Sequence, residues 1–160
     1  MTLEVTGIDH VFITVSDLRR SEIFYDGMMK LLGFRKGNGL IDGEPVIHYY
    51  NRCLQYSLRQ ARPGASGDNP LAAGLNHLCF QVKDTFTVDV AARDLQSLGV
   101  AITPPQLYPE YATDYYTTYF NDPDGIRLEI VNRTRMRDVI CERWADLDTF
   151  ENPLRKIDAR

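Results

Sequence analysis

Two of the three histidines in this sequence, His10 and His77, stand at matching places in two similar strings. "GIDHVFITVSD" begins at Gly7 and "GLNHLCFQVKD" begins at Gly74, and both read Gly-x-x-His, an apolar stretch, then Val-x-Asp. A carboxylate, Glu129, alternates with apolar residues in "GIRLEIV". Two imidazoles and one carboxylate can bind divalent Fe, Mn, Co, Ni or Zn and leave coordination positions open for water or substrate. These three residues are therefore the candidate metal ligands.

The two histidine strings belong to a duplicated unit, which is the first feature to seek in a sequence. "LLGF" ending at Phe34 is echoed by "SLGV" ending at Val100, and "YYN" ending at Asn51 is echoed by "YFN" ending at Asn121. The turn Asp-Pro-Asp-Gly at 122–125 makes the second copy slightly longer. The duplication predicts two modules with the same order of elements.

Each module is predicted to run strand, helix, strand, strand, strand. The opening strands alternate between two faces, and apolar residues at helical spacing follow each of them. The first helix begins at Ser16 or Asp17 and ends at Gly33, and the second begins at Asp84 or Thr85 and ends at Gly99. The remaining strands are expected near 36–42, 45–51 and 53–60 in the first copy, and near 100–103, 114–121 and 126–131 in the second.

The faces that carry the histidines should look away from the helices, because the helices cover the apolar faces of the strands. Two such units, related by a pseudo-twofold axis, would form a curled mixed sheet, a cup with helices outside. Its concave face would bring His10, His77 and Glu129 together. Any one of the three alone would be an ordinary half-buried or solvent-facing side chain. The equivalence of His10 and His77 in the repeat, with a carboxylate on the appropriate strand, favours a metal site. A cup completed across a homodimer is an alternative that sequence does not separate from a single-chain cup.

The length predicts one compact domain, and the repeat predicts that it is an α+β domain at 1–135. Module one is expected at 5–62, a Gly- and Pro-rich linker at 62–74, and module two at 74–135. A partly helical tail is expected at 136–160. A net charge of −4 offers no basic footprint for nucleic acid, and no apolar run is long enough to span a membrane. Three widely spaced cysteines indicate reduced thiols and a cytoplasmic protein.

At these residues the sequence resembles the vicinal oxygen chelate superfamily, which includes glyoxalase I, extradiol dioxygenases, and fosfomycin and bleomycin resistance proteins. The matching stretches are "GIDHVFITVSDLRRSEIFYDGMMKLLGF", "GLNHLCFQVKD" and "YFNDPDGIRLEIVN". The resemblance implies the paired β-α-β-β-β cup and a divalent metal held by His10, His77 and Glu129. That metal would chelate two adjacent oxygens of a small-molecule substrate.

The sequence departs from the glyoxalase I pattern at the last strand of the first module. "CLQYSLRQA" offers Gln55, Tyr56 or Ser57 where a fourth, often acidic, ligand is usual. A carboxylate that could move a proton in an isomerisation is missing there. Few basic residues surround the second module's turn, which argues against a phosphonate substrate, although Arg127 beside Glu129 keeps an anion contact open.

Tyrosines are frequent in both copies and suit a planar, oxygenated substrate. They are Tyr49, Tyr50, Tyr56, Tyr108, Tyr111, Tyr115, Tyr116 and Tyr119. We expect a metal-dependent enzyme with dioxygenase-like chemistry or glyoxalase-like lyase or isomerase chemistry, in which Gln55, Tyr56 and Tyr119 are the catalytic candidates. The alternative is a metal-free drug-binding protein of the bleomycin-resistance type. His48 is expected to line the cavity or lie at the surface, and the protein is expected to be a homodimer.

Overall fold

The computed structural model describes residue 5, residues 7–64 and residues 74–155, and it has the expected α+β organisation. The first module consists of β1 (His10–Val15), α1 (Leu18–Leu31), β2 (Arg35–Ile41), β3 (Glu44–Tyr50) and β4 (Gln55–Gln60). The second consists of β5 (Leu78–Gln81), α2 (Thr85–Ser97), β6 (Gln106–Leu107), β7 (Tyr116–Asn121) and β8 (Arg127–Asn132). The predicted duplication of a β-α-β-β-β unit is confirmed.

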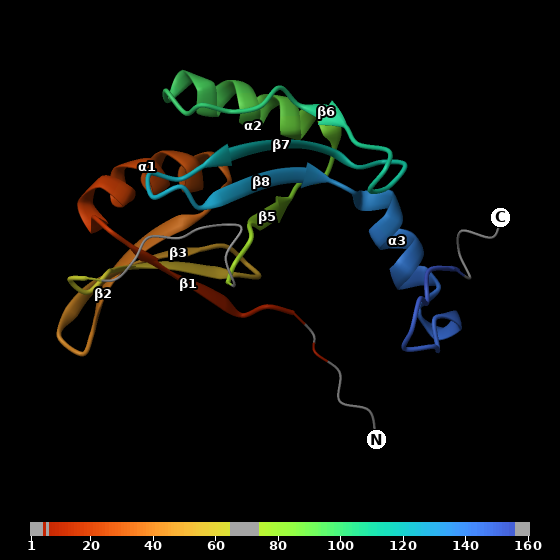
Figure 1. Cartoon of the computed structure of the whole chain (residues 1–160), viewed down its shortest axis with the longest axis horizontal. Coiled ribbons are helices and arrows are strands. Elements are labelled where there is room, and N and C mark those ends of the chain that lie inside the picture. Colours follow the sequence, from red (N-terminus) through yellow and green to blue (C-terminus); the bar gives the residue numbers. More distant parts are fainter. Residues whose placement is uncertain (1–4, 6, 65–73, 156–160) are drawn as a thin grey trace.

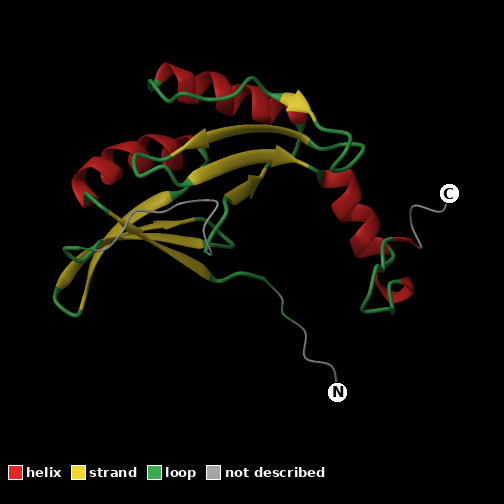
Figure 2. Cartoon of the chain, viewed as in Figure 1, coloured by secondary structure: helices red, strands yellow, loops and turns green. Residues whose placement is uncertain are grey.

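The two modules form two four-stranded sheets with the same topology. The strand order is β1-β4-β3-β2 in one sheet and β5-β8-β7-β6 in the other. In each sheet the opening strand pairs in parallel with the last strand, and the remaining pairs are antiparallel. Each long helix covers one face of its own module's sheet, as Figures 1 and 2 show. The opposite face of each sheet is the one that carries the histidine of its opening strand.

Aspartates and glycines fix the ends of both long helices. The Asp17 side chain accepts a hydrogen bond from Arg20 N at 3.0 Å, and the Asp84 side chain accepts one from Thr87 N at 2.7 Å. The sequence left two candidates for the start of each helix, and in both helices the aspartate is the N-cap. Gly33 and Gly99 follow the helix ends with φ of 78° and 81°, a conformation that glycine adopts without strain.

One predicted strand of the second module is wrong. The stretch near 100–103 contributes only an isolated bridge from Ile102 to Phe120, and β6 lies further on, at Gln106–Leu107. Pro104 and Pro105 separate the two, and neither proline has a backbone N–H to donate to a neighbouring strand. The edge of the second sheet is therefore short.

The core is shared by both modules. Tyr25 and Met28 of α1 and Val88 of α2 are fully buried, as the helical spacing predicts. The ring of Phe80 in β5 lies 6.1 Å from that of Tyr56 in β4, so the apolar faces of the two sheets meet in one cluster. Within one chain the modules are thus associated mainly through the sides that carry the helices.

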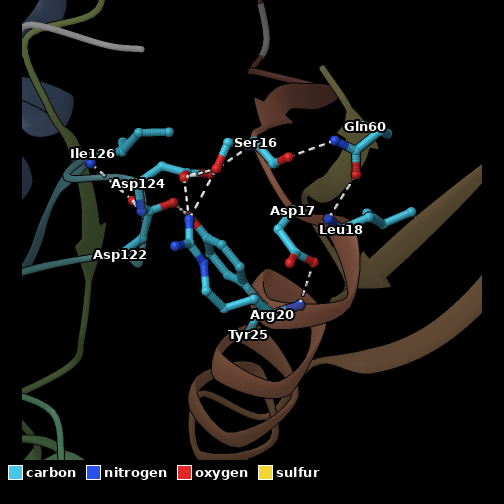
Figure 3. A network of polar contacts seen from close by, with 9 residues as sticks. All are labelled: Ser16, Asp17, Leu18, Arg20, Tyr25, Gln60, Asp122, Asp124 and Ile126. Carbon is cyan, nitrogen blue, oxygen red and sulfur yellow. Dashed lines mark hydrogen bonds and ion pairs between the residues drawn. The ribbon is translucent and has the colours of Figure 1, made fainter. Parts of the chain in front are cut away.

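A polar network also joins the modules, between the start of α1 and the turn that connects β7 to β8 (Figure 3). Ser16 N donates to Asp124 Oδ2 at 2.8 Å, and the Arg20 guanidinium pairs with the same carboxylate. The buried Tyr25 hydroxyl donates to Asp122 Oδ2 at 3.0 Å, while Asp122 Oδ1 accepts from Ile126 N at 2.8 Å. The Asp-Pro-Asp-Gly turn therefore acts as a clamp between the modules.

The described part of the C-terminal tail contains two short helical segments, and it leads away from the body of the molecule. Helix α3 spans Thr134–Glu142 and a 3-10 turn follows at Trp144–Asp146. Figure 1 shows α3 leading away from both sheets. Trp144 is 64% exposed and Phe150 is fully exposed. Among the described residues, no helix has both the length and the apolar character needed to cross a membrane.

Candidate metal site

His77 and Glu129, two of the three predicted ligands, lie side by side in the second module. The pairing of β5 with β8 places Cys79 opposite Glu129. His77 precedes Cys79 by two residues, so its side chain lies on the same face as those of Cys79 and Glu129. The distance from His77 Nε2 to Glu129 Oε2 is 3.2 Å. The Glu129 side chain is fully buried, whereas that of His77 is 37% exposed. The pair is therefore open to solvent from the histidine side only.

Two hydroxyl groups fix the orientation of the Glu129 carboxylate. Tyr115 donates to Oε1 at 2.8 Å and Thr117 donates to the same oxygen at 2.7 Å. Burial, followed by the hydrogen bond to Glu129 and its charge, raises the pKa of Tyr115, so this hydroxyl keeps its proton and remains a donor at neutral pH. Oε1 is thus held by the protein, and Oε2 is left directed toward His77.

Both repeat-related histidines have their Nδ1 atoms held by the preceding residue. His77 Nδ1 lies 2.7 Å from Asn76 Oδ1, and His10 Nδ1 lies 2.9 Å from Asp9 Oδ2. Because the partner in each case is an acceptor, Nδ1 carries the proton and the lone pair of the neutral ring is on Nε2. This arrangement is the usual outer contact of a metal-ligating histidine.

The residues present fit a divalent metal ion. The 3.2 Å separation of His77 Nε2 and Glu129 Oε2 is within ion-pair range, yet Oε2 is buried and has no hydrogen-bond partner. A neutral ring presents the Nε2 lone pair to this oxygen, so the contact becomes favourable with a proton on Nε2 or with a metal ion between the two atoms. Donors about 2.1 Å from a common ion, at angles between a right angle and a tetrahedral one, are about 3.0–3.4 Å apart. The observed spacing falls in that range.

The third predicted ligand, His10, lies on the first module's sheet. Its register partner is Gln55 on β4, and its side chain is 54% exposed. It contacts Asp9 and the ring of Phe12. Within the part of one chain that the structure describes, no group of three His, Cys, Asp or Glu side chains is close enough to hold a metal ion. One chain therefore assembles two of the three predicted ligands.

The face around His10 carries amide, hydroxyl and imidazole groups. His48 Nδ1 lies 2.8 Å from the hydroxyl of the buried Ser57, and Gln55 Nε2 donates to that hydroxyl at 3.0 Å. No carboxylate occupies β4, whose sequence is Gln-Tyr-Ser-Leu-Arg-Gln. His48 is half-buried on this face.

The two tyrosines proposed as catalytic residues have opposite placements. Tyr56 is fully buried in the core, where its hydroxyl lies 2.9 Å from that of Tyr25. It points away from the Gln55 face, so a catalytic role for Tyr56 does not fit the structure. Tyr119 pairs in register with Glu129 and shares its face. Burial, followed by the charge of Glu129, raises the pKa of Tyr119, which keeps this phenol protonated at neutral pH.

Three residues around the His77–Glu129 pair were not among the predicted site residues. Thr117 alternates with Tyr115 and Tyr119, and this spacing of two along a strand was the signal that could have found it. Arg133 lies with its guanidinium carbon 5.7 Å from the ring centroid of Tyr115. Asn76 precedes the histidine in the second string, as Asp9 does in the first, and this shared acceptor position is also visible in the sequence.

The fold is that of paired β-α-β-β-β proteins, and the candidate metal ligands His77 and Glu129 lie on the face opposite the helices. The sequence model of the Glyoxalase/Bleomycin resistance protein/Dioxygenase superfamily matches residues 7–130. The chain belongs to this superfamily.

Relatives of this chain support the same assignment. It is 30% identical over 141 residues to YaeR of Escherichia coli, an uncharacterized protein, with 80% of this chain and 97% of YaeR covered. A glyoxalase/bleomycin resistance protein/dioxygenase domain from Frankia is 28% identical, with a TM-score of 0.68 and coverage of 81% and 98% of the two chains. Lactoylglutathione lyase from Agrobacterium tumefaciens is 20% identical, with a TM-score of 0.61 and coverage of 82% and 96%, and shares the fold.

Proposed function

We propose that this protein is a metal-dependent enzyme that acts on a small substrate with two adjacent oxygen atoms. The observation that carries the proposal is the buried Glu129 Oε2, which faces His77 Nε2 at 3.2 Å without a hydrogen bond. A buried carboxylate oxygen without a hydrogen-bond donor is costly unless a positive charge neutralises it, and a metal ion held jointly by Oε2 and Nε2 would do so. A hydrophobic drug-binding cavity would gain nothing from this pair.

The metal would be divalent Fe, Mn, Zn, Ni or Co, and when bound it would polarise the two substrate oxygens. His77, Glu129 and His10 are its proposed ligands. Tyr115 and Thr117 hold the carboxylate in place by their hydrogen bonds to Oε1. Tyr119, protonated and on the same face, is the proposed proton donor to a substrate oxygen.

We propose that His10 reaches the site from a second copy of the chain, so that the protein works as a homodimer. Among the described residues of one chain no group of three metal-binding side chains forms, so His10 does not complete the His77–Glu129 pair. The helix-bearing faces of the two modules are already packed together. The face around His10 is accessible, since its side chain is 54% exposed. A twofold arrangement would give two equal sites, each with one His10 and one His77–Glu129 pair.

The reaction type is proposed from the groups that surround His10. Gln55 stands at the register position of His10, where an amide can donate or accept a hydrogen bond but cannot take up a proton. This favours chemistry that needs substrate oxygens to be held and protonated, as in ring-cleaving dioxygenases or lyases. An isomerisation would need another base, and His48, 2.8 Å from the Ser57 hydroxyl, is the available one.

Metal analysis of protein purified without chelator or polyhistidine tag tests the proposal. We expect roughly one equivalent of transition metal per chain, and loss of most of it in His10→Ala, His77→Ala and Glu129→Ala. His48→Ala is the matched control and should keep its metal. Less than about a tenth of an equivalent, with none taken up on titration, would instead support a metal-free binding protein.

The compartment is also a proposal. Cys53, Cys79 and Cys141 are all free thiols. Free thiols in exposed positions are typical of a reducing environment, so we place the protein in the cytoplasm.

A further inference from the structure

Two arginines flank the Glu129 face, and each lies over a tyrosine. The guanidinium carbon of Arg127 is 4.3 Å from the ring centroid of Tyr119, and that of Arg133 is 5.7 Å from the ring centroid of Tyr115. Arg127 and Glu129 share one face of β8, because side chains alternate along a strand. Two residues of strand correspond to about 7 Å, so Arg127 lies one substrate length from the proposed metal ligand.

Neither guanidinium forms an ion pair with a carboxylate of the described residues. Among the described residues, the ion pairs of the arginines are those of Arg20, Arg93 and Arg143, and no carboxylate pairs with Arg127 or Arg133. Arg133 Nε is in addition buried without a hydrogen-bond partner. In a chain with a net charge of −4, two unpaired cations beside one buried carboxylate indicate a site prepared for an anion.

The surroundings of Arg127 suit a flat molecule. A groove of about 1130 Å³ includes Arg127, Tyr108, Tyr111 and Tyr119 in its lining. The rings of Tyr108 and Tyr111 are stacked at 5.7 Å, and the ring of Tyr108 meets that of Tyr119 edge to face at 6.0 Å. The groove does not include His77 or Glu129. Tyr119 connects the groove to the candidate metal site, because it lines the groove and pairs in register with Glu129.

The stacking of Arg127 on Tyr119 determines which anion it can bind. A guanidinium that lies on an aromatic ring keeps the N–H groups along its edge free, and these match the two oxygens of a carboxylate. The ring also fixes the plane of the guanidinium, which reduces the conformational entropy lost when the carboxylate binds. The groove residues nearest this guanidinium are the rings of Tyr119 and its neighbours Tyr108 and Tyr111, and such flat rings suit a planar acid better than a tetrahedral phosphonate.

We infer that the substrate is a planar carboxylic acid whose carboxylate binds Arg127 while its two adjacent oxygens reach the site of His77 and Glu129. Arg133 supplies the second positive charge, from the Tyr115 side. This inference rests on the proposed metal site for the adjacent oxygens, but the Arg127 contact is a separate interaction and can be measured separately. Arg127 is thereby a residue that determines specificity.

Calorimetric binding of two probes tests the inference: protocatechuate, a catechol with a ring carboxylate, and methylcatechol, in which a methyl group replaces that carboxylate. We expect the metal-loaded protein to bind protocatechuate about 10-fold to 100-fold more tightly, as a charge-assisted hydrogen-bond pair would give. Arg127→Gln should lose this preference and keep its affinity for methylcatechol. Arg93→Gln, which removes an exposed arginine of α2, is the matched control and should behave as the parent.

Two further measurements separate this inference from the proposed function. Benzoate and benzamide have no adjacent oxygens, so a preference for benzoate that depends on Arg127 should persist in Glu129→Gln and without metal. If that preference persists but metal binding fails, the anion site stands without the metal site. An unchanged preference in Arg127→Gln, or the absence of any preference for the acids in the parent, would overturn the inference whatever the metal content.

Discussion

At the scale of single residues, the site depends on how the Glu129 carboxylate is held. One oxygen accepts two hydroxyl hydrogen bonds, and the other is left without one and faces His77. This division of roles explains why a fully buried carboxylate can remain in an otherwise apolar strand. The protein satisfies one half of the group, and the proposed ion satisfies the other.

Tyr115→Phe should weaken metal binding about 10-fold while leaving the fold intact, because an outer contact of a metal ligand is lost. Tyr116→Phe is the matched control: it is the next residue of the chain, and its hydroxyl donates instead to Asp89 of α2, at 2.7 Å. Competition with a fluorescent chelator gives both affinities. Equal affinities for the two variants would show that the Tyr115 hydroxyl does not support the ligand.

The sequence made His10 and His77 candidates because the repeat places them at equivalent positions, and Glu129 a candidate because strand alternation places it on the face that carries the histidines. It could not place Tyr56, since an amphipathic side chain suits either face of a strand and the strand's first residue was uncertain. The structure starts β4 at Gln55 and directs Tyr56 into the core. Arg133 was missed because it lies just beyond the end of β8, where strand alternation no longer predicts direction.

At the scale of elements, the turn between β7 and β8 holds the start of α1 (Figure 3). Asp122 is the buried part of this clamp, and it accepts hydrogen bonds from Tyr25, Asp124 N and Ile126 N. Burial raises the pKa of Asp122 above its ordinary value of 3.8, although these hydrogen bonds oppose the shift. Ionisation of this buried carboxylate at neutral pH therefore lowers the stability of the folded protein.

Asp122→Ala should lower the free energy of unfolding by about 2–4 kcal/mol, since two backbone N–H groups and the Tyr25 hydroxyl lose their acceptor. Asp122→Asn keeps one oxygen and most of the network, so its loss should be much smaller, about 1 kcal/mol or less. Urea unfolding of the parent and both variants at neutral pH measures these differences. Equal losses for the two variants would contradict the hydrogen-bonding role of Asp122.

The same variants make a prediction about pH. Because the pKa of Asp122 is raised in the folded state, its contribution to stability is present below pH 3.8 and is lost as pH rises through the folded pKa. The parent should therefore lose stability, relative to Asp122→Asn, between about pH 4 and neutral pH. Urea unfolding across this range measures the difference. A constant difference across the range would show that Asp122 does not titrate in the folded protein.

Most elements were predictable from alternation, helical spacing and caps, and the errors have local causes. Asp17 and Asp84 cap their helices, and Gly33 and Gly99 follow the helix ends at positive φ, all of which composition at the boundaries indicates. The strand expected near 100–103 failed because the adjacent pair of prolines shifts the sheet edge to β6. A pattern of apolar residues does not show that the two prolines lack the backbone N–H groups that a strand would donate.

At the scale of the whole molecule, the described part of one chain brings His77 and Glu129 together but does not add His10 to them as a group of three. The repeat predicts two equivalent faces, and the structure confirms the two modules. How such modules associate depends on contacts between distant side chains, here the Tyr56–Phe80 packing and the clamp at Asp122 and Asp124. Those contacts are not periodic in the sequence, and for this reason the sequence left the single-chain cup and the dimer as equal alternatives.

Co-expression of two variant chains tests the central claim most directly. One chain carries His10→Ala and the other Glu129→Ala, and mixed dimers are isolated by two different tags that bind no metal. If His10 comes from the second copy, each mixed dimer has one intact site and one doubly altered site. The account predicts that mixed dimers retain about half of the parent's metal, while dimers of either variant alone retain little. Mixed dimers as poor in metal as the single variants would show that all three ligands come from one chain, or that they hold no common ion.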